Sequence, residues 1–231
     1  FWEFGQPDWD RTKMFMIFGV AEDHDSNPIK IGIGKLKARG ARIVGVNPVR
    51  SGYNAVADDW VGITPGTDGL FIMALIHELL NAGQIDLNYL TRYTNAGFLV
   101  NCAEAGPNKG LFLRDDNGKA QVIDRVTGKL SGYDAKGVQP KLTGHHRHAG
   151  ETYRPAFELL AEQYMSKDYA PDAVAERCGI PASRIKALAA DLARVAFEEE
   201  IVIDQPWTDW KGEKHAQMIG RPVSFHAMRG I

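Results

Sequence analysis

Three segments between Lys13 and Ala82 decide the fold: MFMIFG at 14–19, RIVGV at 42–46 and WVGITPGTDG at 60–69. The first two begin with short apolar runs that are rich in β-branched or large side chains. Strands buried on both faces of a parallel sheet have this composition. Since the intervening segments are long enough for crossovers, the sequence predicts βαβ units and an α/β fold. We expect a doubly wound, mostly parallel, Rossmann-like sheet.

The crossover at 29–36 is ambiguous, because its apolar residues suit both strand alternation and one helical stripe. Gly32 and Gly34 weaken a helix by roughly 1 kcal/mol each. Two parallel strands nevertheless need a crossover between them, so we predict a helix here. Glycines on its buried face would permit close approach to the sheet.

Further elements follow from periodicity. A long helix at 69–82 is apolar nearly all round, which indicates burial between layers. A short amphipathic helix at 86–92 is expected to continue the core. Helices are also predicted at 156–164 and from Pro181 on, and Ile201-Val202-Ile203 is predicted to be a further buried strand.

Helical periodicity fails between Ala96 and Thr152, where Asn-Gly, Thr-Gly and Ser-Gly pairs punctuate short apolar runs such as 111–114 and 121–124. The pattern predicts β-hairpins. Large apolar residues are too few for a separate core, so we expect one α/β domain over 1–231 with a hairpin-rich insertion at 96–152. The tract 145–148 is interpreted as a surface loop rather than a metal site.

Composition sets outer bounds on function. The chain has 231 residues, of which 44% are apolar, which is enough for a substantial core. A formal net charge of −2 argues against a nucleic-acid partner. No apolar run approaches the ~20 residues that span a bilayer, so direct membrane insertion is not expected. The chain begins at Phe1 without an initiator methionine, and we expect it to be part of a longer protein.

Polar loops follow the predicted strands. They are Gly19 to Asn27, Asn47 to Ser51 and Pro65 to Asp68. In an open parallel sheet, ligands bind beyond the carboxyl ends of the strands, where loops enter helix N-termini. We therefore expect these loops to face one crevice that suits a nucleotide. Gln205 follows the strand predicted at 201–203 and is expected at the same edge.

The loop after the first strand allows two interpretations. Asn27 or Ser26 suits a helix cap and Pro28 the first helical position, so backbone N–H groups there could meet a pyrophosphate. Glu22, Asp23 and Asp25 would repel phosphate if they pointed inward. A solvated acidic turn is therefore the alternative.

The second loop begins with Asn47, at the position where dinucleotide folds place a polar residue against a ribose hydroxyl. The alternative is that Asn47 and Pro48 only start a turn. Arg50 could reach a phosphate or pair with a neighbouring acid, and the sequence leaves that choice open.

Several of these segments resemble the molybdopterin-guanine-dinucleotide (MGD) oxidoreductases of the dimethyl sulfoxide reductase family. The resemblance is carried by the FG turn, VNPVRS at 46–51 and ADDWVGITPGTDGLFIMALIHELL at 57–80, and it resumes over 169–185. It covers most of the chain on either side of the insertion. The segments 111–114 and 153–157 are similar to the branch that acts on sulfur oxyanions or polysulfide.

The resemblance implies the third, MGD-binding domain of the catalytic subunit of a bis-MGD molybdenum enzyme. Such an enzyme moves two electrons or an oxygen atom to or from a sulfur compound such as sulfite, thiosulfate, tetrathionate or polysulfide. It implies three partners: the remaining domains of the same chain, an electron-transfer subunit with iron–sulfur centres, and a membrane-anchor subunit.

The family's iron–sulfur ligands and molybdenum ligand precede the matched region, and Cys102 and Cys178 alone cannot hold a cluster. No catalytic residue and no metal ligand is therefore predicted, and these 231 residues alone are expected to be inactive. The alternatives are a non-catalytic scaffold subunit of the same fold and a formate- or nitrate-type molybdoenzyme. An NAD-dependent dehydrogenase is less favoured, because no Gly-x-Gly-x-x-Gly follows the first strand.

The resemblance assigns Asp68 to guanine, whose ring N–H and amino group one carboxylate can accept together. The alternative is an acid favoured by the helix dipole, with Thr67 as the cap. A side chain at Gly19 is expected to crowd the turn beside the pyrophosphate. The residues predicted to bind the cofactor are Gly19, Asn27, Asn47, Pro48, Arg50, Ser51, Pro65, Gly66, Thr67, Asp68 and Gln205.

Overall fold

The computed structural model describes residues 7–19 and 29–227, which form two compact units. The first unit contains the residues up to Gln84 and those from Lys167 on, and the second spans Ile85–Ser166. The insertion predicted at 96–152 falls inside the second unit. A single domain over the whole chain stays a prediction.

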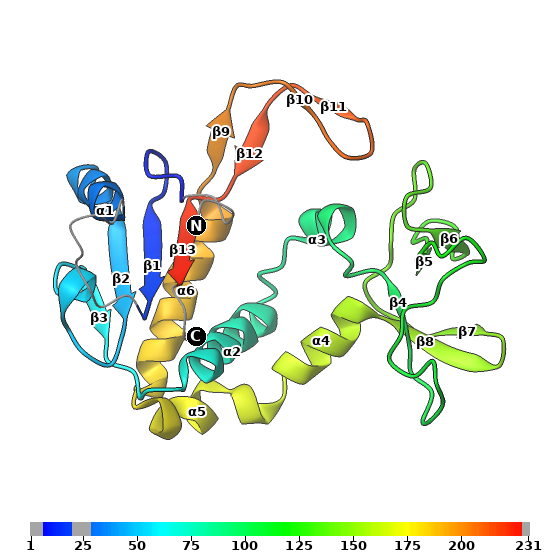
Figure 1. The fold of residues 1–231 in the computed structure, drawn as a ribbon, viewed down its shortest axis with the longest axis horizontal. Coiled ribbons are helices and arrows are strands. Elements are labelled where there is room, and N and C mark those ends of the chain that lie inside the picture. The colour runs from blue at the N-terminus through cyan, green and yellow to red at the C-terminus, as the bar shows by residue number, and fades with distance from the viewer. Residues whose placement is uncertain (1–6, 20–28, 228–231) are drawn as a thin grey trace. The chain divides into compact units, whose positions relative to one another are not determined.

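A four-stranded parallel sheet forms the centre of the first unit (Figure 1). Its strand order is β13-β1-β2-β3. The strands are β1 (Met14–Phe18), β2 (Arg42–Val46), β3 (Asp59–Val61) and β13 (Val223–Ala227). The first two strands are confirmed, and the third lies slightly earlier than the segment 60–63 suggests.

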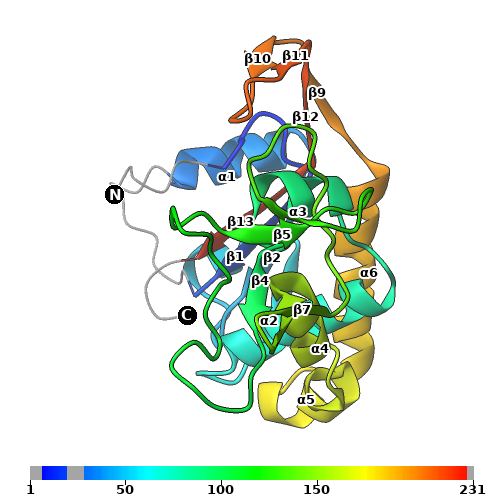
Figure 2. The same cartoon turned by 90° about the vertical axis from the view of Figure 1, so that its right-hand side faces the viewer.

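Helices cover both faces of this sheet, as Figures 1 and 2 show. Alternate side chains of β1 enter the two cores, and each of its five residues is at most 3% exposed. Helix α1 (Ile29–Ala38) packs on one face with Phe15 and Ile17. Met14, Met16 and Phe18 face a core shared with α2 (Asp68–Asn81), α5 (Pro171–Cys178) and α6 (Ala182–Glu198). The doubly wound α/β architecture is thus confirmed.

The ambiguous crossover is a helix, as predicted, and it buries Ile29, Ile33 and Leu36. The long apolar helix predicted at 69–82 is α2, and none of the residues at 70–80 is exposed. Two short 3₁₀ turns lie at Gly52–Asn54 and Lys167–Tyr169.

The prediction that Ile201–Ile203 is a buried strand of the sheet is wrong. This strand, β9, pairs antiparallel with β12 (Met218–Gly220), and Val202 is 51% exposed. With β10 (Trp207–Thr208) and β11 (Lys214–His215) it forms an arm outside the parallel sheet (Figure 1).

The arm leaves the sheet at its amino-terminal edge. Helix α6 returns the chain to that edge, where Glu199 pairs with Lys13 at 2.6 Å, one residue before β1. After the arm, the carbonyl of Pro222 accepts hydrogen bonds from the N–H groups of Lys13 and Met14, and β13 then runs parallel to β1. The fourth place in the sheet is therefore filled by β13.

The second unit is built from short antiparallel strands, which confirms the predicted hairpins. Large apolar residues were expected to be too few for a separate core here, but the unit has a small core of its own, which contains Leu99, Ile123 and Tyr153. Its elements are α3 (Leu87–Tyr93), β4 (Leu99–Asn101), β5 (Gln121–Ile123), β6 (Leu130–Gly132), β7 (His146–His148), β8 (Glu151–Pro155) and α4 (Ala156–Tyr164).

Three further expectations in this unit need correction. Helix α3 forms but buries none of its residues, so it does not continue the core. The segment 111–114 makes only isolated bridges, at Phe112 and Arg114. The tract 145–148 contains strand β7 rather than a loop, because it pairs with β8.

None of the helices in the described part of the chain is long and apolar enough to cross a bilayer.

The two glycines of α1 give a first prediction. A Cβ at Gly32 would lie 2.4 Å from the Trp9 ring, whereas a Cβ at Gly34 would meet nothing within 4 Å. We expect Gly32→Ala to destabilise the chain by about 1–3 kcal/mol through overpacking. Gly34→Ala, the matched control, should stabilise it by about 0.5–1 kcal/mol through helix propensity. Urea denaturation measures both, and equal effects at the two positions would contradict this packing.

A buried carboxylate organises a turn in the second unit. Asp124 accepts hydrogen bonds from the Thr127 hydroxyl at 2.7 Å and from the N–H groups of Thr127 and Gln139 at 3.0 Å. These bonds to the ionised form lower the pKa of Asp124 from 3.8 to about 2.

A carboxyl group with a depressed pKa stabilises the fold above its unfolded pKa, and this contribution is lost as the pH falls through the folded value. We therefore expect the stability difference between the wild type and Asp124→Asn to shrink between pH ~4 and pH 2. Urea unfolding at several pH values measures this difference. A difference that stays constant down to pH 2 would show that the carboxylate charge is unimportant.

Candidate functional site

The carboxyl ends of the first three strands lie side by side. The Gly19 N–H donates to the Val46 carbonyl at 3.0 Å, and the Asn47 N–H donates to the Val61 carbonyl at 3.1 Å. The ladder thus continues one residue beyond β1 and β2. It places the starts of the predicted loops at one edge of the sheet.

Gly19 has a backbone conformation that favours glycine. Its φ is +66°, a left-handed conformation that other residues rarely adopt. An added Cβ would meet no described atom within 4 Å, and the expected crowding of the turn beside the pyrophosphate stays a prediction. Asn27 and the rest of the segment 20–28 lie outside the described residues.

Asn47 is held firmly by its backbone. Its N–H is bound to Val61, and its carbonyl accepts a hydrogen bond from Trp60 Nε1 at 2.9 Å. The side chain is 6% exposed, and its Oδ1 receives a long 3.5 Å bond from the Val49 N–H. Nδ2 is buried and has no hydrogen-bond partner among the residues that the structure describes. The edge therefore contains a buried donor directed at no described group.

Trp60 was missed at the sequence level, where it was treated only as a strand residue. A Cβ on Gly62 would lie 2.8 Å from the Trp60 ring, so that glycine leaves room for the indole. A tryptophan followed two residues later by glycine is a weak signal. Only the pairing of β2 with β3 brings this indole to the Asn47 carbonyl.

A tight turn follows β3. Pro65 and Gly66 occupy its centre, Gly66 has a φ of +81°, and the Thr67 N–H donates to the Thr64 carbonyl at 3.2 Å. These features are those of a type II turn. The Thr67 hydroxyl also donates to Thr64, at 2.7 Å, and makes no capping bond to α2, so the expected cap is absent.

The end of α5 holds this turn in place. The Cys178 carbonyl accepts a hydrogen bond from the Thr64 N–H at 2.9 Å, and the Cys178 thiol points to the Thr67 carbonyl at 3.9 Å. Burial raises the pKa of the Cys178 thiol. Gly179, with a φ of +68°, lies against Thr64, where a Cβ would be 2.9 Å from Oγ1. No local pattern in the sequence indicates this support.

Asp68 is the first residue of α2 and is half-buried. Its carboxylate makes no hydrogen bond or ion pair with any residue in the described ranges. The Phe71 ring lies 6.4 Å from the ring of Phe18, which places the start of α2 near the end of β1. Asp68 is therefore at the same edge of the sheet as Gly19, and its carboxylate makes no capping hydrogen bond to α2.

The loop after Asn47 is open to solvent. Pro48 and Arg50 are exposed, and Ser51 precedes the 3₁₀ turn without making a side-chain cap. Arg50 forms no ion pair within the part of the chain that the structure describes. Its guanidinium is thus available to an anion.

Gln205 is not brought to this edge. It follows β9, which starts on the amino-terminal side of the sheet and belongs to the antiparallel arm. The crevice rule that supported Gln205 therefore does not apply to it.

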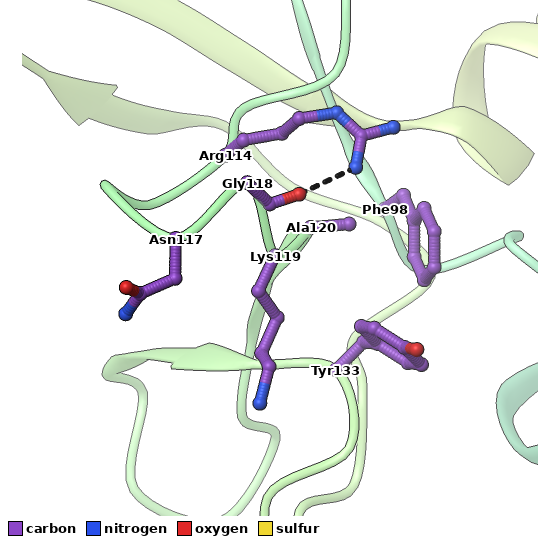
Figure 3. A pocket seen from close by; sticks show the side chains of 7 residues that line it. All are labelled: Phe98, Arg114, Asn117, Gly118, Lys119, Ala120 and Tyr133. Atoms are coloured by element: carbon purple, nitrogen blue, oxygen red, sulfur yellow. Dashed lines mark hydrogen bonds between the residues drawn. The ribbon is translucent and has the colours of Figure 1, made fainter.

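A separate cavity of about 390 Å³ lies in the second unit (Figure 3). Its two cations already have partners, since Arg114 donates to the Gly118 carbonyl at 2.7 Å and Lys119 pairs with Asp134 at 3.0 Å. None of the predicted site residues lines it. The lining residues are Phe98, Arg114, Asn117, Gly118, Lys119, Ala120 and Tyr133.

Comparison with known proteins finds relatives that are much longer than this chain. The chain is 41% identical, over all of its length, to a sulfite dehydrogenase subunit of Allochromatium vinosum, of which it covers 25%. It is 26% identical over 80% of its length to the alpha subunit of perchlorate reductase from Dechloromonas aromatica, of which it covers 24%. The chain thus spans about a quarter of the length of these curated relatives.

A third relative is the putative dimethyl sulfoxide reductase catalytic subunit of Halobacterium salinarum, which is 30% identical over 68% of the chain, with 19% of the relative covered. No family model matches the chain. Among solved structures, acetylene hydratase from Pelobacter acetylenicus aligns with 84% of this chain and 18% of its own, at 16% identity and a TM-score of 0.48.

The orphaned amide of Asn47 gives the next prediction. Asn47→Leu keeps the approximate shape of the side chain and removes a buried donor that has no described partner. The free energy of unfolding of the ligand-free chain should therefore stay unchanged or rise by up to about 1 kcal/mol. Asn101→Leu is the matched control, because its Nδ2 donates to Glu151 and its Oδ1 accepts from the Ala103 N–H at 2.8 Å. Asn101→Leu should lower the free energy of unfolding by about 2 kcal/mol or more. Chemical denaturation compares the two, and a loss at Asn47 as large as at Asn101 would contradict an unmet donor.

Proposed function

Because the chain belongs to the molybdopterin oxidoreductases of the dimethyl sulfoxide reductase family, we propose that it is the MGD-binding part of a catalytic subunit. In this proposal the carboxyl edge of the parallel sheet holds the guanosine-diphosphate portion of one MGD of a bis-MGD pair. One observation carries the proposal. A buried donor on Asn47 and a carboxylate on Asp68 lie at one sheet edge, without partners among the described residues.

The chemistry of these groups fits the parts of the nucleotide. An amide N–H of Asn47 can donate to a ribose hydroxyl. The exposed Arg50 guanidinium suits a phosphate oxygen. Gly19, with its left-handed conformation and no side chain, leaves its backbone accessible to the same ligand. Pro48, Ser51 and the turn at 65–67 would line the same ligand. Asn27, outside the described residues, remains a candidate for the pyrophosphate.

Asp68 would distinguish guanine from adenine. Guanine presents a ring N–H and an adjacent amino group, and one carboxylate accepts both, whereas adenine has no such pair of donors. Each charge-assisted bond contributes roughly 1.5–3 kcal/mol. The type II turn at 64–67 lies directly before Asp68 in the chain, and Cys178 holds that turn through Thr64 and Thr67. Together they would fix the position of the Asp68 carboxylate.

The parent enzyme would transfer two electrons, or an oxygen atom, to or from a sulfur compound. The 41% identity to a sulfite dehydrogenase subunit supports sulfite first, with thiosulfate, tetrathionate and polysulfide as related substrates. When bound, the molybdenum cofactor supplies the redox chemistry. The residues of this chain would bind and orient it, and none of them is proposed as a catalytic acid or base.

One of the same relatives supports a multi-subunit assembly. The sulfite dehydrogenase relative is named as one subunit of its enzyme, which supports an assembly of several subunits. We propose that the remaining domains of the parent chain carry an iron–sulfur cluster. An electron-transfer subunit with iron–sulfur centres, together with a membrane-anchor subunit, would complete the complex.

The decisive substitution is Asp68→Ser in the full enzyme, which keeps a good helix-start residue. We expect MGD and molybdenum content to fall sharply, about tenfold or more if two charge-assisted bonds are lost. The melting temperature of the cofactor-free protein should barely move, because Asp68 makes no capping bond.

Asp86→Ser is the matched control. Asp86 caps α3 by accepting a hydrogen bond from the Tyr89 N–H at 2.9 Å, in the second unit. This change should leave cofactor content intact. Wild-type cofactor content in Asp68→Ser, together with a lowered melting temperature, would identify Asp68 as a structural helix-start residue and refute the assignment.

A further inference from the structure

The antiparallel arm contains a cluster of three side chains that have the chemistry of metal ligands. Asp209, Glu213 and His215 each offer one ligand atom, and these atoms lie within 4.8 Å of one another. The cluster lies on the hairpin formed by β10 and β11, which leaves the amino-terminal edge of the sheet. It is thus at the edge opposite to Gly19 and Asn47.

The spacing of two of these atoms matches that of neighbouring ligands on one ion. His215 Nε2 lies 3.1 Å from Asp209 Oδ2. Nitrogen and oxygen ligands bind zinc at about 2.0–2.2 Å, so two ligands at roughly tetrahedral or right angles are about 3.0–3.4 Å apart. An ion could therefore replace the proton that now joins this pair, with little movement of either side chain.

The two inner ligands are already oriented. The Asp209 side chain is fully buried, and its Oδ1 accepts hydrogen bonds from the N–H groups of Lys211 at 2.9 Å and Glu213 at 3.0 Å. This leaves Oδ2 directed at the imidazole. The His215 ring stacks on Trp207, with centroids 4.5 Å apart and planes 19° from parallel. Outer contacts of this kind fix the direction of a ligand before metal binds.

The third ligand completes a set of two carboxylates and one imidazole. Glu213 is exposed, so its side chain can turn toward the other two without breaking the core. Three protein ligands with positions left for water suit a divalent cation of borderline character, such as zinc.

The position also explains what such an ion would do. A two-stranded ribbon is marginally stable in water, and β10 and β11 share only two residue pairs. An ion held by His215 of β11 and by Asp209 and Glu213 of the loop that joins β10 to β11 would cross-link this end of the ribbon. Binding free energy at such a site becomes folding free energy of the segment.

We propose that Asp209, Glu213 and His215 form a binding site for one divalent cation of the zinc class, which staples the arm. The site is independent of the nucleotide edge and does not rest on the proposed function.

The test is a Zn²⁺ titration of the metal-free 231-residue chain, followed by calorimetry and by tryptophan fluorescence, because Trp207 stacks on a ligand. We expect one ion per chain. Glu213→Gln and His215→Gln should each weaken binding at least about tenfold, the loss that even an outer-shell change can cause. Glu213→Gln alters an exposed side chain, so it is the variant expected to disturb the hairpin least.

His148→Gln is the control, because this exposed histidine lies in strand β7 of the second unit and belongs to no such cluster in the described ranges. Its Zn²⁺ affinity should equal that of the wild type. Unchanged affinity in Glu213→Gln and His215→Gln would overturn the proposal, as would a loss confined to His148→Gln. Failure of the wild type to bind Zn²⁺ would overturn it equally.

Discussion

The structure of the first unit depends on the parallel ladder that joins β1 to a neighbour on each side. Every residue of β1 is buried, so its backbone can satisfy its hydrogen bonds only through β2 and β13. The register of β1 with β2 then sets where both strands end. The same ladder places Gly19 beside Val46 and Asn47 beside Val61. The candidate site is therefore a direct consequence of strand pairing, before any side chain is considered.

Sequence reasoning succeeded where burial leaves a strong local pattern. The apolar runs at 14–18 and 42–46 could only be inner strands, and the need for a crossover correctly decided 29–36. Polar residues at strand ends then predicted which loops meet. The contacts that stabilise this edge of the sheet could not be predicted from the sequence. Trp60 reaches the edge through the pairing of β2 with β3, and Cys178 reaches it through the packing of α5. No local periodicity encodes such contacts.

Two of the errors concern short segments whose apolar residues suggested burial. A run of three apolar residues, Ile201–Ile203, is too short for its composition to distinguish an inner strand from an arm, and the chain had already crossed to the amino-terminal edge along α6. The helix at 87–93 shows the same limit, because its apolar residues suit a core that does not cover them. For Ile201–Ile203, the direction in which α6 carries the chain decided the outcome, rather than hydrophobicity.

The buried polar side chains of the described residues differ in how fully their hydrogen bonds are satisfied. Asp124 and Asn101 satisfy their side chains with several bonds inside the second unit, where they fix turns and strand ends. Asn47 uses its backbone bonds for position and leaves Nδ2 without a described partner. An unmet buried donor costs about 1–3 kcal/mol, a large share of the stability of a small domain. Departures from full hydrogen bonding are expected at functional sites, and this is the physical reason to seek the cofactor at the edge that Asn47 occupies.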